Sequence, residues 1–404
     1  MNGAVAVTGL GVVTPLGIGW QAFWEGLLAG RCATGPVRAF DASPYLVNRG
    51  AEVRDFQPQD HLRRLAPDSI GRAAQLGAAA ARLALVDAGL AEPAWDPDRA
   101  GVAMGTTSGE PAEIERLDDA WVADRRESAD TRFVARYPCH TIAINVAAEL
   151  GLRGPNAMIP TACAAGNYAV AWATDQLRWG RADLMLAGGA DIFSRITYAG
   201  FARLGAISPD LCRPFDRGRK GMIPGEGAGV VVLEPLDGAR ARGARIYAEV
   251  AGYGLSCDAH HMTGAHPQGD GAVRAMEMAL ATAGARPGDV DYISAHGTGT
   301  PTNDQVEAIA IARLFGDGAP PVSSIKSMIG HTMGAASALE SVACALAVHR
   351  GMLPPTANFE AADDGCKLDF VPNVARERRV RLAMNNAYAF GGNNASVLLR
   401  EVET

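Results

Sequence analysis

The feature that most constrains the fold is a regular alternation of two kinds of segment. Short runs rich in Val, Leu and Ile, such as residues 5–13, 183–191 and 228–235, are separated by longer alanine-rich stretches such as residues 70–90. Uninterrupted apolar runs are typical of strands buried on both faces, and parallel strands need long, usually helical, connections. The sequence therefore predicts an α/β protein in which helices form layers on buried sheets.

The alternation occurs in two series. The second series begins near residue 245 and ends with two apolar strands at the carboxyl terminus. We therefore expect two halves of mixed β/α content, residues 1–245 and residues 246–404, although no repeat of individual residues is visible. Residues 107–140 are rich in Asp, Glu and Arg and poorly patterned, which predicts an inserted surface loop with short helices.

Composition excludes several classes of function. No apolar run is long enough to cross a membrane and the amino terminus lacks a signal-peptide pattern, so we expect a cytoplasmic protein without membrane contact. The net charge of −7 gives no electrostatic footprint for nucleic acid. The seven cysteines lack metal-ligand spacing, so we expect neither a metal site nor a disulfide framework. The segment "GLGVVT" at residues 9–14 lacks the third glycine of a dinucleotide fingerprint, which favours a tight strand exit instead.

One cysteine has unusual neighbours. Cys163 lies in "PTACAAGNYA", between a predicted short strand and a predicted helix at residues 164–180. Small neighbours let the backbone turn sharply and leave the sulfur open to a reactant. The positive end of the helix would also lower the pKa of the thiol. This pattern favours a nucleophile, and a small buried cysteine that fills space is the alternative.

Two histidines could act with such a thiol. His296 in "SAHGTGTP" and His331 in "KSMIGHTMGAAS" each follow a predicted strand and are flanked by glycine, which would let the imidazole protrude into a cleft. A helix beginning at His331 would keep its ring neutral. Lys326 lies on the strand before His331, and Glu307 lies on the helix after His296. A buried lysine needs a carboxylate, so we expect these two to pair and to orient the histidines.

A glycine-rich stretch near the carboxyl terminus, "AYAFGGNN", places Phe390 before two glycines at a strand end. Backbone N–H groups there could form an oxyanion hole with the N–H of Cys163, and the phenyl ring could cover the sulfur. A core aromatic residue beside a turn is the alternative.

Six motifs in one order resemble a known family. They are "TACAAG", "RPFDRGRKGMIPGEGAGVVVLE", "DAHHMT", "HGTGTPTND", "SSIKSMIGHTMGAAS" and "AFGGNN". Together they resemble the β-ketoacyl-acyl-carrier-protein synthases of the KAS I/KAS II class, which include the ketosynthases of type II polyketide systems. The resemblance covers nearly the whole chain. It implies the thiolase fold, in which duplicated βαβαβαββ halves form a five-layered αβαβα core that is normally dimeric.

The resemblance also implies the chemistry. Cys163 would accept an acyl chain from an acyl carrier protein as a thioester. His296 and His331 would stabilise the enolate oxygen of a malonyl thioester, also held on carrier protein, as carbon dioxide leaves. Lys326, paired with Glu307, would support the histidines. No cofactor is implied beyond the phosphopantetheine of the carrier protein.

The remaining implied roles concern entry to the site. Thr298 and Thr300 would hydrogen-bond the pantetheine arm, and Phe390 would be a gate whose backbone N–H joins that of Cys163 in the oxyanion hole. The family's gating loop usually begins with glycine, whereas this chain has Ala389, which would restrict the swing of the gate.

Several alternatives remain. A degradative thiolase would have a second active cysteine near the carboxyl terminus, and a ketosynthase III enzyme would have one histidine and an asparagine. A chain-length-factor subunit binds chains without condensing them and loses the nucleophile, whereas this chain keeps Cys163. "CAAGNYA" resembles the ketosynthases of aryl-polyene clusters more than a KAS II of primary fatty acid synthesis. A polyene enzyme would pair with a chain-length-factor subunit as a heterodimer, and the alternative is a homodimer.

Overall fold

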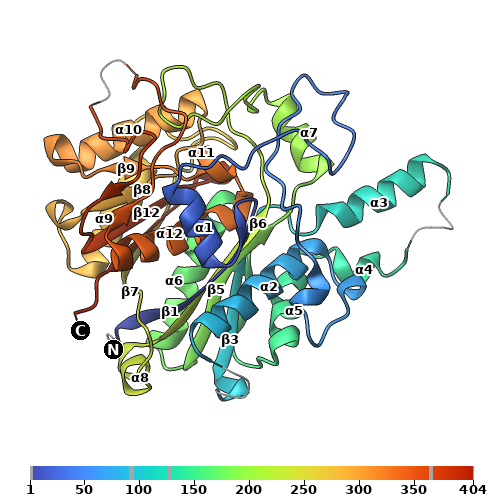
Figure 1. The fold of residues 1–404 in the computed structure, drawn as a ribbon, viewed down its shortest axis with the longest axis horizontal. Coiled ribbons are helices and arrows are strands. Elements are labelled where there is room, and N and C mark those ends of the chain that lie inside the picture. The colour runs from blue at the N-terminus through green and yellow to red at the C-terminus, as the bar shows by residue number, and fades with distance from the viewer. Residues whose placement is uncertain (1–2, 91–94, 126–129, 364–366, 404) are drawn as a thin grey trace.

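The strands of the amino-terminal half are β1 (Val5–Thr14), β3 (Ala100–Gly105), β4 (Asn156–Ile159), β5 (Leu184–Asp191) and β6 (Gly227–Pro235). In the computed structural model they form one array in the order β4-β3-β5-β6-β1 (Figure 1). β4, β3 and β5 are parallel, β6 is antiparallel to β5, and β1 is antiparallel to β6. The described residues are 3–90, 95–125, 130–363 and 367–403.

The strands of the carboxyl-terminal half are β7 (Ala248–Cys257), β8 (Tyr292–Ser294), β9 (Val322–Ser323), β12 (Leu382–Tyr388) and β13 (Asn393–Arg400). Their order is β9-β8-β12-β13-β7, with the same directions as in the first array. β1 and β7 pair where the two arrays meet. In each half, the fifth strand along the chain lies between the fourth and the first and is antiparallel to both. The duplicated topology implied by the resemblance is therefore confirmed.

Helices form the other three layers of the core. Two helices lie between the arrays and contact each other and strands of both, and the outer faces are covered by further helices (Figure 1). The inner pair is α6 (Ala165–Arg178) and α12 (Ala336–Arg350), the first outer pair is α2 (Arg72–Asp87) and α5 (Thr141–Leu150), and the second is α9 (Asp270–Ala283) with α10 (Pro301–Phe315) beside it. α12 is buried from Ala336 to Val348, which explains why its sequence lacks a polar face. The five-layered αβαβα core is confirmed.

The inner helices approach each other closely at Gly166 of α6. A Cβ atom at this position would lie 2.4 Å from the backbone nitrogen of Ala338 on α12. We expect Gly166→Ala to lower the free energy of unfolding by about 1–3 kcal/mol, because backbone atoms must move to admit the methyl group. Chemical denaturation measures this, with Gly200→Ala as the control, because no atom lies within 4 Å of a Cβ there. A Gly166→Ala variant as stable as the wild type would contradict the close packing.

The glycines of "GLGVVT" lie within β1 and not at its exit, so the prediction of a tight strand exit is wrong. A Cβ at Gly9 would lie 2.2 Å from the carbonyl oxygen of Ala84, and one at Gly11 would lie 1.8 Å from that of Ala80. Both carbonyls belong to α2. These glycines therefore let a helix pack directly on the strand, which is a structural role.

None of the described helices has the length and apolar character that a membrane span needs. The other named helices and strands of the described chain are β2 (Gly17–Ile18), α1 (Trp20–Leu28), α3 (Pro111–Val122), α4 (Phe133–Arg136), α7 (Arg195–Arg203), α8 (Leu236–Ala241), α11 (Lys326–Ile329), β10 (Met352–Leu353) and β11 (Arg376–Glu377).

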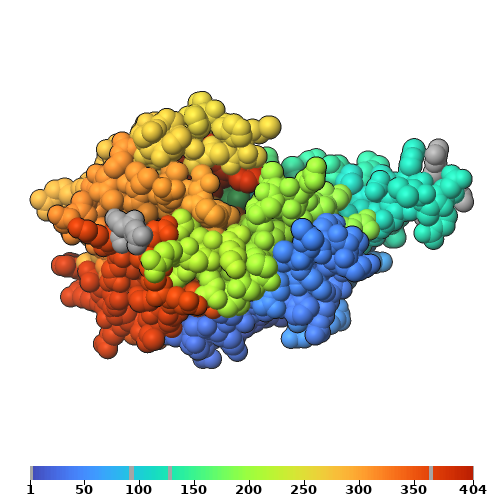
Figure 2. Space-filling view, turned by 90° about the horizontal axis from the view of Figure 1, so that it is seen from above, coloured from blue at the N-terminus to red at the C-terminus, as the bar shows by residue number. Residues whose placement is uncertain are grey.

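Within the segment predicted as an inserted loop, residues 107–140, the described part around α3 projects from the body of the protein (Figure 2). It contains α3 and α4, and α3 is longer than the short helices that the composition predicted. Residues 126–129 of this prediction lie outside the described residues. Trp121 and Val122 at the end of α3 are exposed, so this segment presents apolar side chains at the surface.

Candidate active site

Cys163 lies at the predicted strand-to-helix transition. β4 ends at Ile159, residues Ala162–Ala164 form a single 3₁₀ turn, and α6 follows directly. Ala162 has a φ of 51°, which is uncommon for a residue with a side chain and marks a strained turn. The turn buries Cys163, whose exposed fraction is 8%, at the amino-terminal end of the central helix α6.

The thiol does not have the lowered pKa that the sequence suggested. Burial raises the pKa of Cys163 to about 12, and the nearby charge of Lys326 offsets only part of this effect. The helix terminus was expected to dominate, but desolvation of a thiolate costs more than a helix dipole returns. The resting group is therefore a thiol, and any reaction at sulfur must move its proton.

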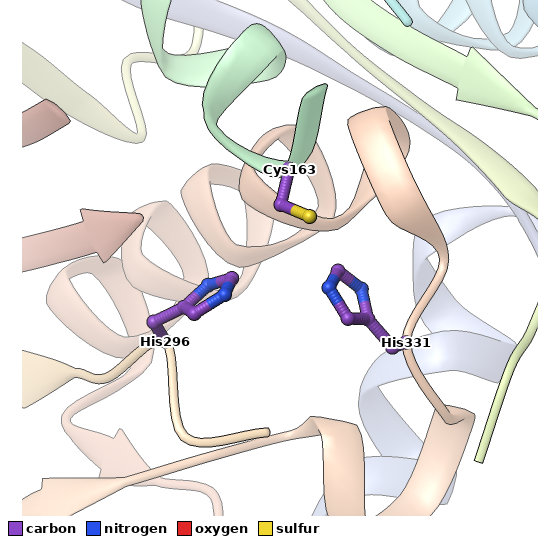
Figure 3. A group of neighbouring side chains, drawn as sticks. All are labelled: Cys163, His296 and His331. Carbon is purple, nitrogen blue, oxygen red and sulfur yellow. The ribbon is translucent and has the colours of Figure 1, made fainter. Parts of the chain in front are cut away.

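The structure brings together the three residues that the sequence singled out. The Cys163 sulfur and one nitrogen from each of His296 and His331 lie within 4.8 Å of one another, and both rings are directed toward the sulfur (Figure 3). The ring centroids are 5.4 Å apart, with an interplanar angle of 83°. Burial lowers the pKa of both imidazoles well below 6.5, and the charge of Lys326 lowers it further. Both rings are therefore neutral near pH 7.

Neighbouring groups define which ring nitrogen carries the proton. The backbone N–H of Met333 donates to Nδ1 of His331 at 3.1 Å. The ammonium group of Lys326 lies 3.4 Å from Nδ1 of His296 and donates to it. With both Nδ1 atoms accepting, the proton of each neutral ring is on Nε2. The site therefore offers two N–H donors that do not need a cationic ring.

The expected pairing of Lys326 with Glu307 is wrong. Lys326 begins α11 and does not lie on a strand, and its ammonium group forms a buried ion pair with Glu340 of α12. Glu307 instead accepts hydrogen bonds from the backbone N–H groups of His296, at 2.8 Å, and Gly297, at 2.7 Å. It therefore fixes the loop that carries His296. The sequence contained a signal for Glu340, because it is the one acid in an otherwise apolar helical stretch.

A cavity of about 130 Å³ leads to these groups. Thr298 and Thr300 line it, and their hydroxyl groups are 2.9 Å apart. Phe390 lies at its exposed side with 42% of its surface accessible, and its ring packs against Phe201 with centroids 5.9 Å apart. Ala389 has an extended backbone with a φ of −133°, so alanine is unstrained there in this conformation.

This constellation defines a class of protein. A buried cysteine at the start of a central helix, with two neutral imidazoles facing it in a duplicated five-layered α/β core, is the site of a condensing enzyme of the thiolase type. The chain belongs to the β-ketoacyl synthase family. Residues 2–239 match the family's "Beta-ketoacyl synthase, N-terminal domain" and residues 247–360 match its "Beta-ketoacyl synthase, C-terminal domain".

Individual relatives include a subunit of a polyketide synthase and a 3-oxoacyl-[acyl-carrier-protein] synthase. The chain is 43% identical over 418 residues to the tetracenomycin polyketide synthase ketoacyl synthase alpha subunit of Streptomyces glaucescens, covering 99% of this chain and 98% of the relative. It is 41% identical over 407 residues to 3-oxoacyl-[acyl-carrier-protein] synthase 2 of Coxiella burnetii, covering 98% of each. Among solved structures, the ishigamide ketosynthase/chain length factor superposes with a TM-score of 0.97 at 44% identity, with each chain covered completely.

Proposed function

We propose that this protein is a β-ketoacyl-acyl-carrier-protein synthase, which condenses an acyl group held on Cys163 with a malonyl group held on an acyl carrier protein. The observation that carries the proposal is the approach of the Cys163 sulfur and the two imidazole nitrogens to within 4.8 Å of one another. One thioester on the sulfur and a second at the imidazoles would place the two reacting carbons side by side.

The first step loads the enzyme. The Cys163 sulfur attacks the acyl thioester of the carrier protein, the bond from the carbonyl carbon to the pantetheine sulfur breaks, and the thiol proton passes to that departing sulfur. The backbone N–H groups of Cys163 and Phe390 stabilise the oxyanion of the tetrahedral intermediate. The pantetheine arm lies along Thr298 and Thr300, and Phe390 acts as the gate.

The second step forms the carbon–carbon bond. The bond between the malonyl methylene carbon and its carboxylate breaks, carbon dioxide leaves, and the electron pair forms an enolate whose oxygen accepts hydrogen bonds from Nε2 of His296 and His331. The enolate carbon attacks the thioester on Cys163, the carbon–sulfur bond breaks, and the released thiolate takes a proton from solvent. The raised pKa of Cys163 favours that protonation. The buried pair of Lys326 and Glu340 supports the histidines.

The two halves of the chain have separate duties in this scheme. Residues 1–245 supply the nucleophile, and residues 246–404 supply both histidines and the gate. No cofactor takes part beyond the phosphopantetheine of the carrier protein, and we place the enzyme in the cytoplasm.

We further propose that the enzyme acts in a type II polyketide or polyene pathway as a heterodimer with a chain length factor. The likeness to the tetracenomycin subunit and to the ishigamide ketosynthase/chain length factor supports this assignment. The likeness to 3-oxoacyl-[acyl-carrier-protein] synthase 2 supports the second candidate, a homodimeric enzyme of fatty acid elongation.

The test is intact mass spectrometry after incubation with a panel of acyl carrier protein thioesters, followed by malonyl carrier protein. We expect an acyl adduct that malonyl carrier protein discharges as a β-ketoacyl product. The adduct should be absent in Cys163→Ala and unchanged in Cys257→Ala, which removes an exposed cysteine. Preference for polyunsaturated or polyketide chains would favour the first pathway, and preference for saturated chains the second. No adduct from any donor, with a chain length factor present, would refute the enzyme and favour a chain-binding subunit.

A further inference from the structure

Asp191, the last residue of β5, is a buried carboxylate with no assigned role in the scheme above. Its exposed fraction is 0%. Burial raises its pKa to about 6, so the group is ionised at pH 7.5. A buried anion of this kind needs several donors around it, and their identity shows what the charge holds in place.

Four donors converge on this carboxylate from two separate loops. One loop follows β3 and supplies the hydroxyl group of Thr106 at 2.9 Å, the backbone N–H of Thr107 at 2.7 Å and that of Ser108 at 3.0 Å. The other loop follows His331 and supplies the backbone N–H of Gly334 at 2.6 Å. Asp191 therefore ties the loop after β3 to the turn that carries His331.

That turn is strained and tightly enclosed. Met333 has a φ of 54°, although it is not glycine. A Cβ at Gly334 would lie 2.5 Å from the carbonyl carbon of Thr106, and one at Gly189 would lie 2.4 Å from the carbonyl oxygen of Gly334. A strained backbone persists where surrounding structure holds it. The hydrogen bond from the Gly334 N–H to the Asp191 carboxylate is the polar contact that holds this turn.

Met333 determines the proton position on His331, because the Met333 N–H donates to Nδ1 of that ring. The next N–H along the chain, that of Gly334, donates to the Asp191 carboxylate. If the turn relaxes, Nδ1 loses its donor and the ring can place its proton there instead. Nε2 would then present a lone pair, which repels an enolate oxygen.

We propose that Asp191 is a positioning residue for the condensation step, which holds the turn at Met333 and Gly334 so that His331 keeps its Nε2–H tautomer. This role rests on the proposed function. It assigns Asp191 to carbon–carbon bond formation, because the bonded turn carries the imidazole. The carboxylate charge also raises the pKa of the Cys163 thiol, so its removal should not slow loading.

The test compares Asp191→Asn with Glu110→Gln. Each oxygen of the Asp191 carboxylate accepts two hydrogen bonds. The asparagine side chain replaces one of these oxygens with an NH₂ group, which can only donate, so two donors on that side lose their acceptor. Glu110 is the matched control, because it is also buried and accepts backbone N–H groups, those of Ala73 and Ala74, away from the cavity. The measurements are the rate of Cys163 acylation, kcat and KM for malonyl carrier protein, and ¹⁵N shifts of the histidine rings.

We expect Asp191→Asn to lower the kcat of condensation about 10–100-fold, with an acylation rate no lower than that of Glu110→Gln, a similar KM and a ring shift toward the Nδ1–H tautomer. Thr106→Val removes the side-chain donor to Asp191, together with the acceptor of the Gly109 N–H, and keeps the three backbone donors. It should give a weaker form of the same result if Asp191→Asn does not fold. An equal loss of acylation and condensation, or an unchanged tautomer, would overturn the positioning role. A wild-type protein that forms no β-ketoacyl product would instead refute the proposed function itself.

Discussion

Lys326→Met should lower the free energy of unfolding by about 3–5 kcal/mol, which is the usual cost of leaving one member of a buried ion pair without its partner. The side chains of Lys326 and Glu340 are each 1% exposed, so water cannot replace the lost ammonium group. Equilibrium unfolding in urea measures the change. Lys220→Met is the matched control, because Lys220 is exposed and its replacement should leave stability nearly unchanged.

The double variant Lys326→Met/Glu340→Leu separates charge from packing. Replacing both members of a buried pair with apolar residues is often close to neutral, so most of the lost stability should return. Activity should not return, because His296 would still lack the donor at its Nδ1. A single variant within about 1 kcal/mol of the wild type would show that Glu340 is protonated or hydrated, and that the pair is not ionic.

The second large effect is expected at His331. His331→Ala should slow condensation by about 10²–10³-fold, which is the usual loss when one donor to a developing oxyanion is removed. Acylation of Cys163 should change far less, because the backbone N–H groups that we propose for the oxyanion of that step remain. Single-turnover experiments that follow the two steps separately measure the difference.

His349→Ala is the control for the loss of an imidazole. His349 packs on the ring of Tyr247, with centroids 5.0 Å apart, and does not line the cavity. This variant should retain both steps. If His331→Ala slowed acylation as much as condensation, the imidazole would act in thiol chemistry, and the assignment of its Nε2–H to the enolate oxygen would be wrong.

The sequence was sufficient for the fold and for the three central site residues. Alternation of apolar strands with helices is a local pattern that predicts buried sheets covered by helices, whereas the duplicated five-layered core is what the resemblance of the six motifs implies. Cys163, His296 and His331 each lie beside glycine or alanine at the end of an element. His296 follows a strand and His331 follows α11, so the convergence of the three is implied by the resemblance and observed in the structure.

The incorrect predictions concern properties that depend on how deeply a side chain is buried and on how helices pack against one another. The pKa of Cys163 was misjudged because desolvation depends on how much protein lies around the sulfur, which no motif records. The predicted pairing of Lys326 with Glu307 is wrong because it was inferred from positions along the chain. Glu340 reaches Lys326 from a different helix, and such a contact depends on how the helices pack. Gly9 and Gly11 were misread for the same reason, since the approach of α2 is not visible in β1.

The burial of α12 from Ala336 to Val348 has a consequence for evolution and redesign. This helix has protein on every side from Ala336 to Val348, and it carries the acid that holds Lys326. Any change of volume along it would be transmitted to both sheets and to the histidines, so it is a poor place to seek new substrate preferences. Phe201 lies on the short helix α7, and Phe390, which packs against it, is 42% exposed. Variation in chain selectivity among descendants of this sequence should therefore accumulate there more than along α12.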